Sequence, residues 1–258
     1  MRTNSLKRTL TAGGAAFGPN LQIPSPWLVE IIAGAGFDYV MLDGEHGAAF
    51  DDLANLIIAA DGAGITPVVR VPNHDRSWLL RALEYGAGGV QVPMVNTPQE
   101  ARRIVDEVKY APLGNRGFSN VTRSARYGAA DARDHATSAN GETMLVLQLE
   151  SKQAVQNAAA ISKVSGVDML FIGPGDLAQS LGHPGEPTAP AVVKAMREII
   201  AAVADRVILS TSAFAADDVR VWHQAGVRCF LTSSMHPIRR TFEATRAELV
   251  AGCPHDGA

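Results

Sequence analysis

The chain has little cysteine, few aromatic residues and no long apolar runs. Two cysteines among 258 residues, Cys229 and Cys253, cannot form a disulfide framework or a four-cysteine zinc site, so reduced thiols and a cytoplasmic location are expected. No run reaches the roughly 18 to 20 apolar residues that span a bilayer, and no secretory signal is expected. With 23 Lys and Arg against 26 Asp and Glu there is no basic excess, so neither a membrane nor nucleic acid is an expected partner.

Apolar, strand-like runs alternate with helix-like segments along nearly the whole chain. The expected strands are 15–20, 38–43, 67–72, 89–93, 144–150, 168–172, 207–211 and 228–233. Segments between them, such as 76–85, 98–109 and 190–204, open with helix-start signals. This alternation implies a parallel sheet, and eight repeats predict an α/β fold, a (β/α)₈ TIM barrel forming a single domain over residues 1–258. A doubly wound open sheet is the alternative.

One stretch, 111–142, interrupts the alternation and is rich in Gly, Asn, Ser, Arg and Asp. It is expected to be a long loop, and such loops inside compact domains are usually functional or disordered. It contains Gly114-Asn-Arg-Gly117, a sequence that can form an anion-binding nest, although a pair of glycines alone is weak evidence. No linker or internal repeat is apparent, so no domain boundary is expected.

Charged and amide side chains follow the predicted strands at the ends where a barrel places its active site. They are Asp43-Gly-Glu45-His46, Arg70, Gln148, Glu150 and Asp176. Residues two apart on a strand share a face, so Gln148 and Glu150 should point together into the barrel mouth. A carboxylate beside a buried strand is costly unless its charge is compensated, and a divalent cation compensates it well. Glu150 and Asp176 are therefore expected to hold Mg²⁺ or Mn²⁺.

Each of these residues also has a purely structural interpretation. Glu150 and Asp176 could cap the helices that follow them, Arg70 could pair with one of these carboxylates, and His46 could be an ordinary loop histidine. Their convergence on one rim favours a metal-dependent enzyme. Lys152 raises the rival chemistry of a Schiff base, but its position two residues past Glu150 favours a solvated surface residue. The remaining histidines show no metal-ligand spacing, which disfavours zinc.

Six short motifs occur in order along the chain. They are Leu42-Asp-Gly-Glu-His46, Pro67-Val-Val-Arg70-Val-Pro72, Val92-Pro-Met-Val95, Gly114-Asn-Arg-Gly117, Gln148-Leu-Glu150 and Phe171-Ile-Gly-Pro-Gly-Asp-Leu177. The set resembles the class II, metal-dependent pyruvate aldolases, a family that includes 4-hydroxy-2-oxo-heptane-1,7-dioate aldolase and 2-dehydro-3-deoxyglucarate aldolase. The resemblance is strong from the second to the sixth predicted strand and weak after about Gly185. It implies a TIM barrel assembled as a hexamer of paired subunits that exchange a C-terminal helix.

The resemblance also implies roles for individual residues. Glu150 and Asp176 would hold a divalent cation, Mg²⁺, Mn²⁺ or Co²⁺, which also chelates pyruvate. Arg70 would bind the 2-oxo oxygen and stabilise the enolate, with Gln148 near the same oxygen or a metal-bound water. His46 would be the acid/base group.

Two further positions match the family less closely. The backbone amides of Gly173, Pro174 and Gly175 would receive the pyruvate carboxylate, but the family usually has Ala or Ser where Gly175 stands. The family often backs its histidine with an aspartate on the helix before the fourth strand, and this chain has Glu84 there. The ends of the seventh and eighth predicted strands also depart from the family pattern, so these differences bear on which aldehyde is accepted.

Together these roles imply a lyase that cleaves or forms 4-hydroxy-2-oxo acids, giving pyruvate and an aldehyde through a metal-stabilised pyruvate enolate, with no organic cofactor. Three alternatives stay open. A lyase acting on citryl- or malyl-type thioesters would use the same carboxylates but needs room for coenzyme A. A Schiff-base aldolase would survive chelation, and a non-catalytic barrel would bind a ligand without turnover.

Overall fold

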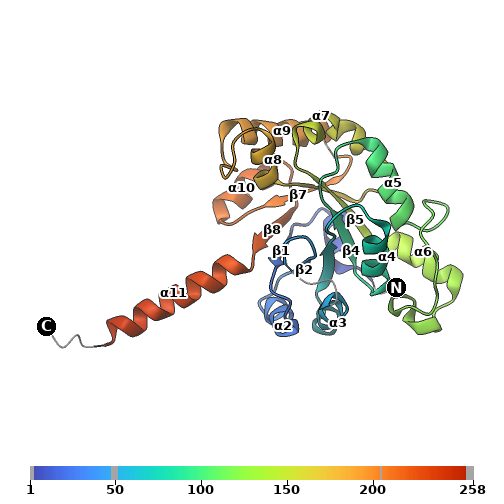
Figure 1. Ribbon diagram of the computed structural model, residues 1–258, viewed down its shortest axis with the longest axis horizontal. Helices are drawn as coiled ribbons and strands as arrows, with labels where there is room; N and C mark the ends of the chain where they lie inside the picture. Colours follow the sequence, from blue (N-terminus) through green and yellow to red (C-terminus); the bar gives the residue numbers. More distant parts are fainter. Residues whose placement is uncertain (1–2, 48–51, 204, 254–258) are drawn as a thin grey trace.

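Eight parallel strands close into a barrel in which each strand pairs with its neighbours in sequence and β8 pairs with β1. The computed structural model describes residues 3–47, 52–203 and 205–253 (Figure 1). The strands are β1 Ala16–Leu21, β2 Tyr39–Asp43, β3 Thr66–Arg70, β4 Gly89–Val92, β5 Met144–Leu149, β6 Met169–Ile172, β7 Ile208–Ser212 and β8 Cys229–Ser233. The predicted (β/α)₈ barrel is confirmed, and each predicted strand lies within two residues of an observed one.

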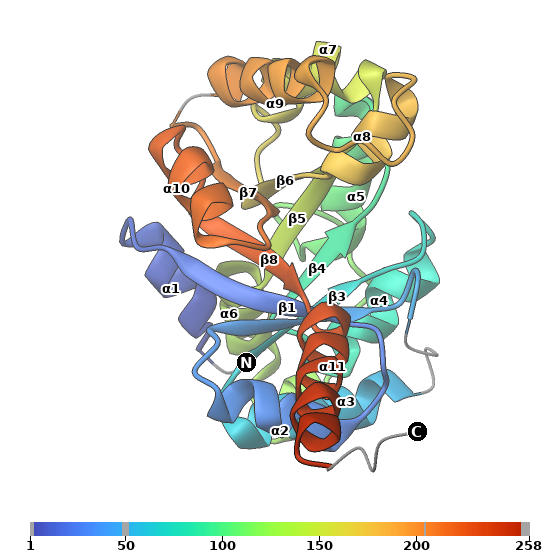
Figure 2. The same ribbon diagram turned by 90° about the vertical axis from the view of Figure 1, so that its left-hand side faces the viewer.

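Helices precede, separate and follow the strands, and those that lie between consecutive strands cover the outside of the barrel (Figures 1 and 2). They are α1 Ser5–Thr11, α2 Pro26–Gly34, α3 Leu53–Ala63, α4 Arg76–Glu84, α5 Pro98–Val108, α6 Ala132–Glu142, α7 Lys152–Ile161, α8 Pro174–Ser180, α9 Pro190–Val203, α10 Ala216–Gln224 and α11 Met235–Ala251. The helix-start signals act as expected. Thr97 and Glu100 form a reciprocal capping box at α5, and the Asp75 side chain accepts a hydrogen bond from the Ser77 amide at α4.

Side-chain alternation along the strands separates two apolar regions. Val40, Leu42 and Val69 point outward into the core between barrel and helices, whereas Met41 and Val68 point into the barrel. Every residue of β2 and β3 is buried, because helices cover one face and the barrel interior fills the other. The last residue of β2, Asp43, is in the set of side chains that point into the barrel, and so is the last residue of β3, Arg70. Both strands therefore place a polar side chain at the barrel mouth.

The segment 111–142, expected to be a loop, contains regular structure. A 3₁₀ segment, η2, covers Arg123–Gly128, and α6 covers Ala132–Glu142. The expectation was wrong because α6 buries only His135 and Ala139 and so has almost no apolar face to detect. The missed signal was Asp131, whose side chain accepts hydrogen bonds from two amides of the first helical turn.

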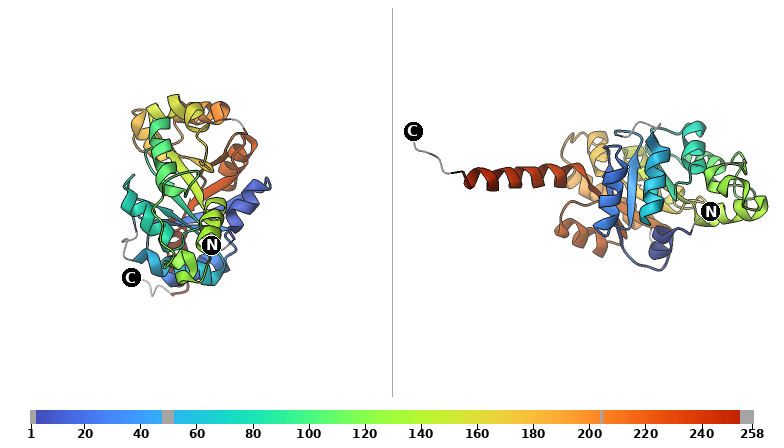
Figure 3. Two further views of the ribbon diagram at one scale, coloured as in Figure 1. Left: turned by 90° about the vertical axis from the view of Figure 1, so that its right-hand side faces the viewer. Right: turned by 90° about the horizontal axis from the view of Figure 1, so that it is seen from below.

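Helix α11 stands away from the barrel, as two roughly perpendicular views show (Figures 1 and 3). None of its described residues is buried, and the side chains of Phe242 and Leu249 are 72% and 70% exposed. On the barrel itself, Trp27 and Ile31 of α2 are also exposed, at 79% and 66%. No helix in the described part of the chain has the length and apolar composition needed to cross a bilayer.

Candidate active site at the barrel mouth

The carboxyl ends of β2, β3 and β5 bring polar side chains to one rim of the barrel. Asp43 is the register partner of Arg70, and Arg70 is that of Gln91. Gln148 lies in the inward row of β5, and Glu150 follows that strand by one residue. Strand β6 leads directly into α8, whose first turn contains Asp176 (Figure 2). The rim predicted from the sequence is therefore present.

Arg70 is fixed in the rim by two carboxylates. Its Nε lies 3.0 Å from Asp43 Oδ1, its Nη2 lies 2.7 Å from Asp43 Oδ2, and its Nη1 lies 3.2 Å from Glu45 Oε2. Asp43 is fully buried and also accepts hydrogen bonds from the Glu45 and His46 amides and from Asn20 Nδ2. Burial acts to raise the pKa of Asp43, but the hydrogen bonds and charge of Arg70 bring it below its usual value. Asp43 therefore stays ionised and holds the guanidinium plane in place.

Glu45 lies between Arg70 and His46. Its Oε2 is 3.8 Å from His46 Nε2, and the His46 side chain is 58% exposed at the mouth. Burial raises the pKa of Glu45, while the charges of Arg70 and His46 oppose that rise. The imidazole is thus accessible to a bound molecule and has a carboxylate behind it.

Glu150 is 2% exposed and is held by two donors. Its Oε1 accepts from the Met94 amide at 2.7 Å, and its Oε2 accepts from Gln148 Nε2. Gln148 Oε1 in turn accepts from Gln91 Nε2 at 2.6 Å. Burial raises the pKa of Glu150 to about 7, and the negative charges of Asp176 and Glu45 add to the rise. The Glu150 carboxylate is thus buried near two other acids.

Three consecutive residues at the start of α8 shape the space beside Glu150. A Cβ added at Gly173 would lie 2.6 Å from Glu150 Oε2, so a larger residue there would displace the Glu150 carboxylate. Of the amides expected to receive a carboxylate, that of Gly173 donates to the Leu149 carbonyl, and Pro174 has no N–H. Gly175 therefore supplies the remaining donor of the three, in the first turn of the helix where amides lack intrahelical acceptors. A Cβ at Gly175 would meet nothing within 4 Å, so the family's Ala or Ser fits there as well.

Helix capping does not explain Glu150 or Asp176. Helix α7 is capped by Ser151, whose side chain accepts from the Ala154 amide, and not by Glu150. Gly173, not Asp176, is the residue that precedes α8. Lys152 is exposed on the first turn of α7, which agrees with a surface residue and not with a Schiff-base lysine.

Glu150 and Asp176 fit a divalent cation by their chemistry. The Glu150 carboxylate is deeply buried and lies in the field of the Asp176 charge, so a cation between them would offset the cost of both charges. Hard oxygen ligands of this kind suit Mg²⁺ or Mn²⁺. Within the described residues, no group of three or more His, Cys, Asp or Glu side chains converges as a metal-binding set. A cation at this rim would thus take two of its ligands from these carboxylates.

Glu84 does not lie at this rim. It is the last residue of α4, which begins at Arg76 beyond the end of β3 and runs back toward the start of β4. Its charge acts on Tyr110 and Arg116, and no contact with His46 is present among the described residues. Contact between Glu84 and His46 stays a prediction. The Arg116 guanidinium stacks 4.6 Å from the centre of the Tyr110 ring, away from the mouth.

Sequence reasoning assigned no role to several residues that support the site. Asp43 and Glu45 hold Arg70, and Asn20 supports Asp43. Gln91 orients Gln148. The Met94 amide donates to Glu150, and Met94 itself has a positive φ of 54°. A usable signal was available for Gln91, a polar residue inside a short apolar strand. The Met94 amide had none, because its role comes from backbone conformation.

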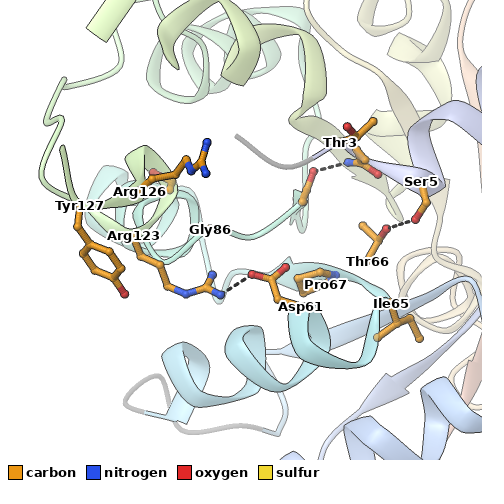
Figure 4. A pocket seen from close by; sticks show the side chains of 14 residues that line it. Thr3, Ser5, Asp61, Ile65, Thr66, Pro67, Gly86, Arg123, Arg126 and Tyr127 are labelled. Carbon is orange, nitrogen blue, oxygen red and sulfur yellow. Dashed lines mark hydrogen bonds and ion pairs between the residues drawn. The ribbon is translucent and has the colours of Figure 1, made fainter. Parts of the chain in front are cut away.

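A cavity of about 610 Å³ lies on the opposite side of the barrel, beside the starts of β3 and β4. Figure 4 shows Arg123 pointing toward Asp61, and Ser5 hydrogen-bonded to Thr66 in the wall of this cavity. It contains none of the rim residues. The rim residues therefore lie at the open mouth and not in this hollow.

The chain is similar to known proteins over most of its length. The family model described as HpcH/HpaI aldolase/citrate lyase matches residues 21–231. A pyruvate aldolase from Rhizobium etli is 40% identical over 199 residues, covering 76% of this chain and 77% of the relative. A 2-keto-3-deoxy-L-rhamnonate aldolase from Klebsiella pneumoniae is 36% identical over 200 residues, covering 77% and 74%. The crystal structure of citrate synthase SbnG superposes with a TM-score of 0.88 at 30% identity, covering 96% of this chain and 98% of the other.

Proposed function

The chain belongs to the HpcH/HpaI aldolase/citrate lyase family, and we propose that it is a metal-dependent aldolase that cleaves or forms 4-hydroxy-2-oxo acids, with pyruvate and an aldehyde as the partners in the reaction. One observation carries the proposal. A fixed guanidinium, an accessible imidazole and a buried carboxylate occupy one rim of the barrel. Barrel enzymes build their active sites at this end of the strands.

A divalent cation, Mg²⁺, Mn²⁺ or Co²⁺, would be held by Glu150 and Asp176. When bound, such a cation supplies a Lewis acid for the 2-oxo group. Gln148 fixes the orientation of the Glu150 carboxylate through its Nε2, and the Gly175 amide is available to a substrate carboxylate. The buried Glu150 carboxyl favours its ionised form once a cation lies beside it.

Arg70 and His46 divide the remaining chemistry. Cleavage removes the proton of the 4-hydroxyl and leaves negative charge on the oxygen of the 2-oxo group. Arg70 carries a permanent positive charge on its guanidinium and is almost completely buried at the rim. It would stabilise the charge on that oxygen where water is largely excluded and such stabilisation is most effective. His46, exposed at the mouth, is placed to accept the hydroxyl proton and to return it in the reverse direction.

Replacing Arg70 with Lys is expected to lower kcat at least about tenfold, roughly 1.4 kcal/mol of transition-state stabilisation. Lysine keeps the charge but cannot make the two parallel bonds to Asp43 that hold the guanidinium plane. Steady-state kinetics of pyruvate release measure the effect. If Arg70→Ala changed only KM, Arg70 would bind substrate without stabilising the transition state.

We also propose that subunits assemble by exchanging α11, as in the hexamer implied by the family resemblance. The helix buries none of its described residues, and its Phe242 and Leu249 side chains face solvent together with Trp27 of the barrel. Surface of this kind is usually covered by a partner. Phe242→Glu is expected to reduce the assembly measured by sedimentation velocity, with circular dichroism confirming the fold. An unchanged sedimentation coefficient, or a monomeric parent protein, would contradict the exchange.

A cytoplasmic location is part of the same proposal. Cys229 is buried and Cys253 is exposed, and both are free thiols. Free cysteines suit a reducing compartment.

Substrate class is tested with a panel of 4-hydroxy-2-oxo acids and of citryl- and malyl-coenzyme A thioesters. Pyruvate release from the free acids alone supports the proposed function. Turnover of the thioesters alone would assign the chain to the citrate lyase side of the family. Covalent trapping by borohydride with pyruvate would indicate a Schiff base instead.

A further inference from the structure

The three side-chain nitrogens of Arg70 face two different carboxylates. Nε and Nη2 face Asp43, whereas Nη1 faces Glu45 Oε2 at 3.2 Å. A substrate oxygen can therefore reach the guanidinium by displacing one of these carboxylates. We propose that the 2-oxo oxygen of the substrate displaces Glu45 from Arg70, and that the displaced carboxylate then pairs with His46. This inference rests on the proposed function, because it takes a 2-oxo acid as the ligand.

Asp43 cannot be displaced from Arg70. It is fully buried, and both of its oxygens are engaged, by Arg70, by two backbone amides and by Asn20. Moving it would leave several buried donors without acceptors, and each such loss is costly. Asp43 thus acts as the permanent partner of Arg70.

Glu45 is held far more loosely. Its Oε2 is buried yet has no hydrogen-bond partner, since its approach to Arg70 Nη1 is an ion pair without hydrogen-bond geometry. The side chain is 21% exposed, so it has space in which to move. It also lies in the field of Asp43 and Asp176, and an arriving carboxylate adds a further negative charge. Like charges at short range disfavour its present position, so substrate binding promotes its departure.

His46 provides the destination. Its Nε2 is already 3.8 Å from the same Glu45 oxygen, and its side chain is 58% exposed. A carboxylate that moves from Arg70 to His46 fixes the orientation of the imidazole and stabilises its protonated form as the 4-hydroxyl proton arrives. Glu45 is therefore a positioning residue. Before substrate binds it occupies Arg70 and so competes with the substrate, and in the complex it supports His46.

The test is Glu45→Gln, measured as two separate quantities on enzyme saturated with Mn²⁺. Isothermal titration calorimetry gives the Kd for pyruvate, and steady-state kinetics give kcat for cleavage of a 4-hydroxy-2-oxo acid. The amide removes the competing charge but keeps the shape, so pyruvate should bind about threefold more tightly, the size expected for a partly exposed ion pair. The loss of the partner of His46 should lower kcat at least about tenfold. A residue with only a structural role would weaken binding and slow turnover together.

Glu107→Gln is the matched control. Glu107 is also a partly buried glutamate with an unpartnered oxygen near arginines, but it lies on α5 outside the barrel. It should leave both quantities unchanged, and Glu45→Ala should reproduce the tighter binding if Glu45→Gln proves unstable.

Weaker or unchanged pyruvate binding by the Glu45 variants would overturn the displacement, and tighter binding with unchanged kcat would overturn the transfer to His46. Failure of the parent enzyme to bind pyruvate with its metal would instead contradict the proposed function, and the inference would fall with it.

Discussion

Glu150→Ala and Asp176→Ala should each abolish turnover and tight binding of Mn²⁺ while the barrel remains folded. Each substitution removes one of the two carboxylate ligands that the protein offers to a divalent cation. Asp176 lies in the first turn of α8 and is exposed, so its loss costs the fold only the modest interaction of a carboxylate with a helix N-terminus. Calorimetric titration with Mn²⁺ and a thermal melt measure binding and folding separately.

Glu150 needs an additional variant, because its removal leaves the Met94 amide and Gln148 Nε2 without their acceptor. Two unpaired buried donors cost about 1–3 kcal/mol each, enough to confuse lost binding with lost structure. Glu150→Gln keeps an oxygen in place and should retain the melting temperature more closely while still losing the metal. Glu186→Ala, an exposed carboxylate beyond α8, serves as the control with parent activity. Parent-like turnover by either Glu150 variant after exhaustive chelation would refute the assignment.

His46→Ala should lower aldol cleavage by about 10² to 10⁴, because the 4-hydroxyl loses its proton acceptor. Decarboxylation of oxaloacetate requires no hydroxyl deprotonation, and Arg70 with its Asp43 partner would remain in place. That reaction should therefore survive better in the same variant. Measuring both reactions on one preparation makes the comparison independent of how much protein is active.

Equal losses in the two reactions would show that His46 binds substrate or metal, and its acid/base role would then be wrong. Glu84→Gln provides a further arm of this experiment. A milder loss confined to aldol cleavage is expected if Glu84 of a neighbouring subunit orients His46. Within its own chain Glu84 lies near Tyr110 and Arg116. The expected effect of Glu84→Gln therefore depends on assembly of the subunits.

Most of the barrel was predictable because parallel strands buried on both faces leave a simple signal. β2 and β3 are continuous buried runs, and their partner helices begin at recognisable caps. Helix α6 escaped prediction because it buries almost nothing. Helix α11 was expected only through the family resemblance, because its apolar side chains face solvent in the single chain. Periodicity reports burial, so helices that bury little or await a partner carry a weak signal.

The site was predictable where strand register alone fixes direction. Arg70, Gln148 and Glu150 follow inward-facing rows, so their convergence follows from counting residues along strands. What joins them was not predictable. The two-pronged contact of Asp43 with Arg70 depends on side-chain torsions, and the Met94 amide depends on a left-handed backbone residue. Glu84 shows the opposite case, since its match to a family position on the helix before the fourth strand did not place it at the rim.

The most direct measurement is pyruvate release from a 4-hydroxy-2-oxo acid by protein stripped of metal, followed by readdition of Mg²⁺ or Mn²⁺. A metal-dependent aldolase built on Glu150 and Asp176 predicts no turnover after chelation and recovery on readdition, with one aldehyde formed for each pyruvate. Undiminished pyruvate release after chelation, together with covalent trapping by borohydride, would contradict it.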